Sequence, residues 1–374
     1  MKITRLETIP LRQRALLLRL YTDNDLVGIG EPMNYEHGRT VARAIDDMGD
    51  YLIGKDPRQI EDHWQALFRS SYSRQMPILL SALSGIEQAC LDVLGKSVGE
   101  PLWRLLGGSA RERLRVYGSA GGNTPEECAA NAKAVVEKGF TALKTTPFPE
   151  PVRLIDTPGA IEKVVERIAA MREAIGPDID LAIDFHRALS PAMSKLLLRE
   201  LEPYKPMFVE EPTHPENVDA LLEITRSTPI PIATGERNTT RWGFREILEK
   251  KAAAVIQPDI RHCGGILEMK KIAAYAEVHY IMMAPHSAAG PVGVAAAVQA
   301  MAGTPNFLIL EYGGGNGEGM FKEPLEFQDG FLELPAAPGL GVEVTEEGIE
   351  ANRSDEWRLR NMRRNPEDGS YSDI

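Results

Sequence analysis

Short apolar runs alternate with amphipathic stretches over most of the chain after residue 115. The runs are RVYGS, TALKT, DLAID, MFVE, PIAT, AAVIQ, YIMMA and FLILE. Between them, apolar residues recur at the spacing of a helix that buries one face. Thr124 and Glu127 form a capping box with Pro125 between them, which marks one helix start. This alternation predicts a parallel β/α barrel, a modified TIM barrel of about seven to eight units.

The first third of the chain has a different pattern. Residues 3–32 predict antiparallel strands, with ALLLRLYT and LVGIGEP on either side of a turn at residues 23–25. A helical stretch follows, clearest over residues 77–98, and the glycine pair at 107–108 ends it. We therefore expect an α+β unit ahead of the barrel.

The alternation ends after Glu311. Residues 312–350 are rich in Gly and Pro and contain two strand-like runs, GFLEL and GVEVT. We expect three parts: an α+β capping domain at 1–114, a catalytic barrel at 115–325, and a segment at 326–374 that returns to the capping domain.

Composition narrows the class of protein. Of the 374 residues, 43% are hydrophobic, and the net charge is −12, which argues against nucleic acid or an anionic membrane as a partner. Three widely spaced cysteines, Cys90, Cys128 and Cys263, predict reduced thiols and a cytoplasmic location. No apolar run approaches the roughly 18 residues that cross a bilayer, and the N-terminus lacks a signal-peptide pattern.

Three carboxylates carry the most specific chemical signal. Asp184, Glu210 and Glu236 each lie at the end of an apolar run, and successive members are 26 residues apart. That interval is about one β/α unit, so the side chains should meet at the carboxyl ends of neighbouring strands. One such acid alone would more often cap a helix or pair with a basic side chain. Three together need a cation between them, and hard oxygen ligands favour Mg²⁺.

Further ionisable residues lie at or just after the ends of other predicted strands: Lys144, His186, Asp259, His286 and Glu311. His186 shares a face with Asp184 if the chain is extended there. Asp259, on an adjacent strand, would orient His286 and make it a base. The structural alternatives are a loop histidine, a helix cap at Asp259 and a surface lysine at Lys144.

These residues and their order resemble the mandelate racemase subgroup of the enolase superfamily. The blocks DFH, EEP, TGER, QPD…GG and APH…GP are most similar to those of galactonate-type sugar-acid dehydratases. The resemblance covers nearly the whole chain, including the cap and the closing PGLGV. Enzymes of this superfamily use a Lys or His base with Mg²⁺ to stabilise an ene-diolate.

The resemblance implies a Mg²⁺-dependent hydro-lyase that converts an aldonate or aldarate to a 2-keto-3-deoxy sugar acid. The implied metal ligands are Asp184, Glu210 and Glu236. Lys144 and Glu311 are implied to bind the substrate and to help stabilise the charge that develops on its carboxylate.

The remaining implied roles belong to histidines. His286, oriented by Asp259, removes the C2 proton, and His186 protonates the departing C3 hydroxyl. Racemases of this type carry a Lys-x-Lys pair after the second barrel strand, whereas this chain has Lys144 followed by two threonines. The missing second lysine favours elimination over racemisation.

Several alternatives stay open. A racemase or epimerase of a 2-hydroxy acid, and a family member of low activity, fit much of the same pattern. A Schiff-base aldolase using Lys144 would leave the carboxylates unexplained. A catalytically silent barrel that binds a partner would have no use for so many strand-end ionisable groups.

Substrate selection is expected in the N-terminal loops that cover the barrel mouth. The candidates in EPMNYEHGR and SSYSRQMP are Asn34, His37, Tyr72 and Arg74, and His214 is a weaker one. Ordinary surface loops are the alternative interpretation. The expected partners are a small sugar acid and, because the cap helices are apolar, further copies of this chain.

Overall fold

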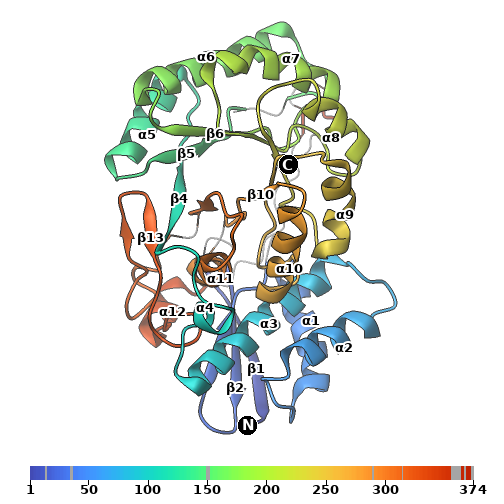
Figure 1. The fold of residues 1–374 in the computed structure, drawn as a ribbon, viewed down its shortest axis with the longest axis vertical. Helices are drawn as coiled ribbons and strands as arrows, with labels where there is room; N and C mark the ends of the chain where they lie inside the picture. Colours follow the sequence, from blue (N-terminus) through green and yellow to red (C-terminus); the bar gives the residue numbers. More distant parts are fainter. Residues whose placement is uncertain are drawn as a thin grey trace.

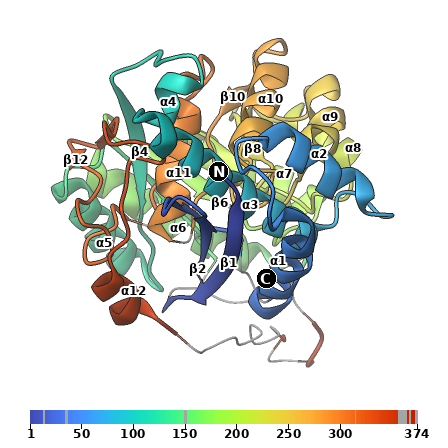
Figure 2. The same ribbon diagram turned by 90° about the horizontal axis from the view of Figure 1, so that it is seen from below.

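The computed structural model describes residues 1–12, 15–33, 37–148, 152–288, 290–313, 315–354, 364–365 and 368–371. Figure 1 shows two packed units, with the blue N-terminal unit below the mostly green, yellow and orange barrel. Seen from below in Figure 2, β1 and β2 lie in front of the barrel.

The N-terminal unit is an antiparallel sheet covered by helices. Its strands run in the order β1 (Ile3–Pro10), β2 (Leu16–Thr22), β3 (Val27–Gly30). Its helices are α1 (Gly38–Leu52), α2 (Ile60–Ser70), α3 (Pro77–Val98) and the short α4 (Leu102–Leu105). The predicted strands and the predicted helix at 77–98 are therefore both present.

Helix α3 lies in the interior between the two units. By length and composition it is the one described helix that could cross a membrane, yet 83% of its apolar window is buried inside the protein. Its buried polar residues bond to both sides: Asp92 accepts from Ile29 N of the cap sheet, and Glu87 accepts from Ile266 N of the barrel. Its apolar character thus reflects a core helix.

The barrel has eight parallel strands: β4 (Arg113–Ser119), β5 (Ala142–Thr145), β6 (Asp180–Asp184), β7 (Val209–Glu210), β8 (Ile232–Thr234), β9 (Val255–Ile256), β10 (Met282–Met283) and β11 (Leu310–Glu311). Successive strands from β4 to β10 pair in parallel, and β11 pairs with β4. A parallel bridge between Met283 and Phe307 completes the circle. The predicted capped barrel is confirmed.

A buried apolar cluster with one residue from or beside each barrel strand combines bulky and small side chains: Tyr117, Ala142, Ala182, Phe208, Ala233, Val255, Ala284 and Ile309. The helices outside are α5 (Pro125–Glu137), α6 (Pro158–Ile175), α7 (Pro191–Leu201) with the 3₁₀ turn η2 (Glu202–Tyr204), α8 (Val218–Thr225), α9 (Thr240–Lys250), α10 (Ile266–Glu277) and α11 (Pro291–Ala302). At the start of α5, Thr124 Oγ1 accepts from Glu127 N at 3.2 Å, as the capping box predicts.

The segment after the barrel contacts both units. It contains β12 (Phe327–Gln328), β13 (Phe331–Glu333) and α12 (Glu346–Asn352), and β13 pairs antiparallel with β4 of the barrel. Beyond it, Leu340 N donates to Asp92 of the cap. The run GVEVT forms only a single bridge, from Val344 to Phe321, and not the predicted strand. Gly339, two residues before this run, and Gly341, its first residue, turn the chain there with φ of +72° and +81°.

Candidate active site

Buried ionisable side chains from β5 to β11 meet at the carboxyl ends of the barrel strands. These strand-end residues are Lys144, Asp184, Glu210, Glu236, Asp259, His286 and Glu311, and none is more than 8% exposed. Parallel pairing explains the convergence, because it places equivalent ends of neighbouring strands side by side. In the ladder, Asp184 lies directly opposite Glu210.

Lys144 is the cation at the centre of this cluster. Its Nζ lies 2.8 Å from Glu210 Oε2, 3.1 Å from Glu311 Oε1 and 3.7 Å from Asp184 Oδ2. Burial by itself lowers the pKa of Lys144, but the surrounding carboxylates outweigh that effect and raise it well above its usual range. The side chain is therefore a fixed positive charge.

In two of the carboxylates, burial disfavours the charged form. Burial raises the pKa of Asp184 to about 6 and that of Glu210 to about 7, and the charge of Lys144 only partly opposes the shift. Glu210 Oε1 is buried and has no hydrogen-bond partner among the described residues. A site with these properties gains stability from additional positive charge.

The donor chemistry suits a hard divalent cation. Within the described part of the chain, no three His, Cys, Asp or Glu side chains already surround one point as metal ligands would. Lys144 supplies the positive charge in this conformation. Carboxylate oxygens at three neighbouring strand ends, one of them without a partner, nevertheless fit Mg²⁺, which prefers oxygen ligands.

His286 and Asp259 form a buried pair beside the carboxylates. His286 Nδ1 lies 2.7 Å from Asp259 Oδ2, while His286 Nε2 lies 3.2 Å from Glu236 Oε2 and 3.5 Å from Glu311 Oε2. Burial alone would raise the pKa of Asp259, but Arg261 and His286 hold it below its usual range. The ionised Asp259 is the hydrogen-bond partner of Nδ1, so Nε2 is the ring nitrogen that faces the cluster.

His186 occupies a tight turn after β6. His186 and Arg187 have left-handed backbone, with φ of 47° and 54°. Two hydrogen bonds hold the turn, from His186 N to Asp184 Oδ1 and from Arg187 N to Glu211 O. His186 Nε2 lies 3.6 Å from Asp184 Oδ2, and burial lowers its pKa to about 4. Non-glycine residues in this conformation are typical of functional sites.

Three residues beside the cluster were not expected from the sequence: Arg237, Arg261 and Glu31. Arg237 Nη2 lies 2.6 Å from Glu236 Oε1, and its Nε donates to Glu211. Arg261 pairs with Asp259 and with Glu31 of the capping domain. Arg237 directly follows the strand-end acid Glu236, and Arg261 lies two residues after Asp259. This closeness in sequence was the only signal that could have identified the two arginines.

The described candidate substrate residues of the capping domain are exposed. His37 is exposed at the start of α1. Arg74 is also exposed, and its guanidinium carbon lies over the Phe68 ring, 5.8 Å from the ring centre. Tyr72 is fully exposed, and Asn34 lies outside the described residues. None of the described members of this group forms an ion pair with the strand-end cluster, so their part in substrate selection stays a prediction.

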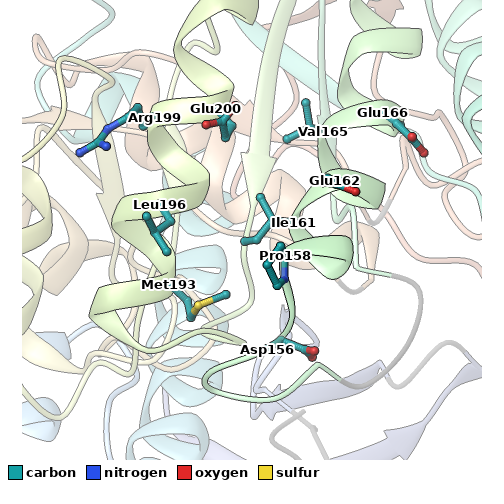
Figure 3. A pocket seen from close by; sticks show the side chains of 10 residues that line it. All are labelled: Asp156, Pro158, Ile161, Glu162, Val165, Glu166, Met193, Leu196, Arg199 and Glu200. Carbon is teal, nitrogen blue, oxygen red and sulfur yellow. The ribbon is translucent and has the colours of Figure 1, made fainter.

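A separate groove lies on the outer surface of the barrel between α6 and α7. Figure 3 shows Pro158, Ile161 and Val165 of α6 facing Met193 and Leu196 of α7. The acidic residues Asp156, Glu162, Glu166 and Glu200 lie around it. No strand-end residue lines this groove.

Two family models together cover most of the chain. The mandelate racemase/muconate lactonizing enzyme N-terminal domain matches residues 6–107, and the enolase C-terminal domain-like model matches residues 127–348. The chain belongs to the mandelate racemase/muconate lactonizing enzyme family. The predicted membership of this family is thereby confirmed.

D-galactonate dehydratases are among the curated relatives of this chain. The chain is 39% identical to the D-galactonate dehydratase of Ralstonia nicotianae and 40% identical to that of Variovorax paradoxus, each over 369 residues and 96% of both chains. These relatives are hydro-lyases that act on a sugar acid, so the predicted enzyme class is confirmed.

Solved structures of the family share the fold. A mandelate racemase/muconate lactonizing enzyme-like protein from Rubrobacter xylanophilus superposes with a TM-score of 0.90 at 35% identity, over 95% of this chain and 98% of that one. An enolase superfamily member from Salmonella Typhimurium gives 0.88 at 31% identity, over 93% and 97%. Both likenesses extend over the cap and the barrel.

Proposed function

We propose that this chain catalyses the Mg²⁺-dependent dehydration of a sugar acid to a 2-keto-3-deoxy sugar acid. The observation that carries the proposal is the His286–Asp259 pair, whose Nε2 faces a buried carboxylate cluster. A histidine fixed by an ionised aspartate is a general base. The D-galactonate dehydratase relatives supply the substrate class.

The first step is removal of the C2 proton by His286 Nε2. Asp259 keeps the Nδ1 proton in place and stabilises the imidazolium that results. The substrate carboxylate is already negative, so a second negative charge develops on it as the proton leaves. Lys144, which remains cationic, is the residue of this chain that meets that charge.

Asp184, Glu210 and Glu236 are the residues proposed to hold the metal. When bound, Mg²⁺ supplies Lewis-acid stabilisation of the substrate carboxylate. Arg237 holds Glu236 of this set in place, because it pairs with both Glu236 and Glu211.

His186 is proposed to deliver a proton to the departing C3 hydroxyl. Hydroxide is a poor leaving group, so elimination needs an acid. Burial favours the neutral ring in the free protein, whereas an anionic substrate beside it raises its proton affinity. The product enol then tautomerises to the keto acid.

A racemase or epimerase is the second candidate. It would need a base on the face opposite His286, and Lys144 is the one lysine in the cluster. Its ammonium is engaged with three carboxylates, and the second lysine of the racemase pattern is absent from the sequence. The same ion pairs disfavour a Schiff-base aldolase, which needs a neutral amine.

The test is a screen of a stereochemically complete set of sugar acids with Mg²⁺, scored for keto-acid formation and run in D₂O. D-Galactonate is the first substrate to test, since the relatives act on it. Keto acid from one or a few members supports the proposal. Deuterated, epimerised acid without keto acid would establish the racemase instead.

A further inference from the structure

A carboxylate of the capping domain lies directly behind the catalytic pair. Glu31, just after β3, is 2% exposed, and Arg261, 1% exposed, separates it from Asp259. Arg261 Nη1 lies 3.6 Å from Glu31 Oε1, while Arg261 Nε donates to Asp259 Oδ1 at 2.9 Å and Nη2 pairs with Asp259 Oδ2. Charges of alternating sign thus run from the cap through Arg261 and Asp259 to His286.

Glu31 is itself held on its far side by the barrel. Its Oε2 accepts from Gly293 N at 3.0 Å, and the backbone N–H of Gly290 also stabilises the carboxylate. A Cβ at position 290 would lie 2.6 Å from Glu31 Oε2, and one at 293 would lie 3.0 Å from Arg261 Cδ. Glycine at both positions therefore permits this close approach. Burial raises the pKa of Glu31, and Arg261 with the two N–H groups opposes that shift.

Backbone contacts fix the same two segments to each other. Met33 N donates to Arg261 O at 3.1 Å, and Gln88 Nε2 donates to Ile260 O at 3.1 Å. The side-chain oxygen Oε1 of Gln88 in turn accepts from Glu31 N at 2.9 Å. The end of β3 and the loop after β9 therefore form one rigid, buried contact between cap and barrel.

We propose that Glu31 is a positioning residue: it fixes Arg261, and through Arg261 the orientation of Asp259 and His286. A buried guanidinium needs partners on every side, because an unpaired buried charge is costly. Without the anion at position 31, Arg261 is drawn from its two-point contact with Asp259 toward other acceptors. The inference rests on the proposed role of His286 as the base.

The test compares Glu31→Gln with the matched control Glu87→Gln. Glu87 lies in the same cap–barrel interface, is 2% exposed, and accepts from Ile266 N and Leu267 N at 2.9 and 2.8 Å, away from Arg261. Both substitutions replace one buried carboxyl group by an amide of the same size. A purely structural role predicts similar losses for the two variants.

For Glu31→Gln we expect kcat for keto-acid formation to fall about tenfold or more with KM within about twofold, because misplacing a base by a fraction of an ångström acts on the transition state. Glu87→Gln should lower the melting temperature comparably and leave kcat within about twofold. Crystal structures should show the 2.7 Å Asp259–His286 contact lengthened only in Glu31→Gln.

Arg261→Lys provides a second route if Glu31→Gln does not fold. It keeps the charge, loses the two-point contact, and should show the same kcat loss. Where Glu31→Gln does fold, adding it to Arg261→Lys should cost less than about twofold more, since the two residues act in series.

Wild-type kcat in Glu31→Gln, or equal kcat losses in Glu31→Gln and Glu87→Gln, would overturn the proposal. Failure of the proposed function is recognised separately: wild-type protein then forms no keto acid from any sugar acid. In that case the crystal structures still decide, and an unchanged Asp259–His286 contact in Glu31→Gln rejects the positioning role.

Discussion

At the scale of single residues, the two histidines have contrasting environments. His286 is 4% exposed and bound to an ionised aspartate, whereas His186 has a side chain that is 33% exposed and a strained backbone. The first environment favours a base and the second a group that meets a substrate at the mouth of the site. The proposed mechanism assigns them to different bonds, so their substitutions should have separable effects.

His286→Asn should abolish both keto-acid formation and exchange of the C2 proton. Loss of a general base typically costs about 10²–10⁴-fold in rate. Incubation with Mg²⁺ in D₂O, followed by mass spectrometry of substrate and product, measures both processes. Retained keto-acid formation on the true substrate would show that His286 is not the base.

His186→Asn should uncouple the two steps. Proton abstraction by His286 persists, so deuterium enters C2 of the recovered sugar acid, while keto-acid formation falls about 10²-fold or more for want of an acid. The same D₂O incubation checks this. If exchange and elimination disappear together, His186 does not act on the C3 hydroxyl alone.

At the scale of elements, local signals determine where helices begin. The side-chain cap at Thr124 forms as its sequence predicts, while Glu127 Oε2 accepts from Asn123 N at 2.8 Å, one residue before the N-cap. Thr157 occupies the same position before α6 but makes no side-chain cap hydrogen bond. Two threonines at the same helix position thus differ, because only Thr124 supplies a capping hydrogen bond.

Thr124→Ala should lower the free energy of unfolding by about 1 kcal/mol, the usual effect of removing a capping side chain. Thr157→Ala is the matched control and should change it by less, because no capping bond is lost. Urea unfolding midpoints measure both. Equal shifts in the two variants would contradict the capping explanation.

At the scale of the whole molecule, the barrel gathers more negative than positive charge at one end. The cluster holds Asp184, Glu210 and Glu311 around the ammonium of Lys144, with Glu236 paired to Arg237. The folded protein should therefore have a cation-binding site that the unfolded chain lacks. A cation that binds only the folded protein raises its melting temperature.

Mg²⁺ added to chelator-treated protein should raise the melting temperature in a saturable way, by an amount equivalent to about 2.7 kcal/mol at 100 times Kd. Differential scanning fluorimetry and titration calorimetry measure the effect. Asp184→Asn and Glu210→Gln should remove it. Glu268→Gln, a buried acid that pairs with Arg241 outside the cluster, should not. An unchanged Mg²⁺ response in Asp184→Asn would exclude the proposed ligand set.

The sequence by itself determined the alternation of strands and helices, the helix at 77–98, and the residues that end each barrel strand. These follow from periodicity and from near neighbours, which act over a few residues. Because parallel strands bring equivalent ends together, the cluster of Lys144, Asp184, Glu210, Asp259, His286 and Glu311 could also be inferred.

Only the tertiary structure decided which partners these groups have. GVEVT has strand-like composition but turns away after Gly339, and β13 pairs with β4 of the barrel. Lys144 lies among the acids, and Glu31 reaches Arg261 from the other unit. Such contacts join charges that are far apart in the chain, and their energy depends on burial and distance, which no local pattern specifies.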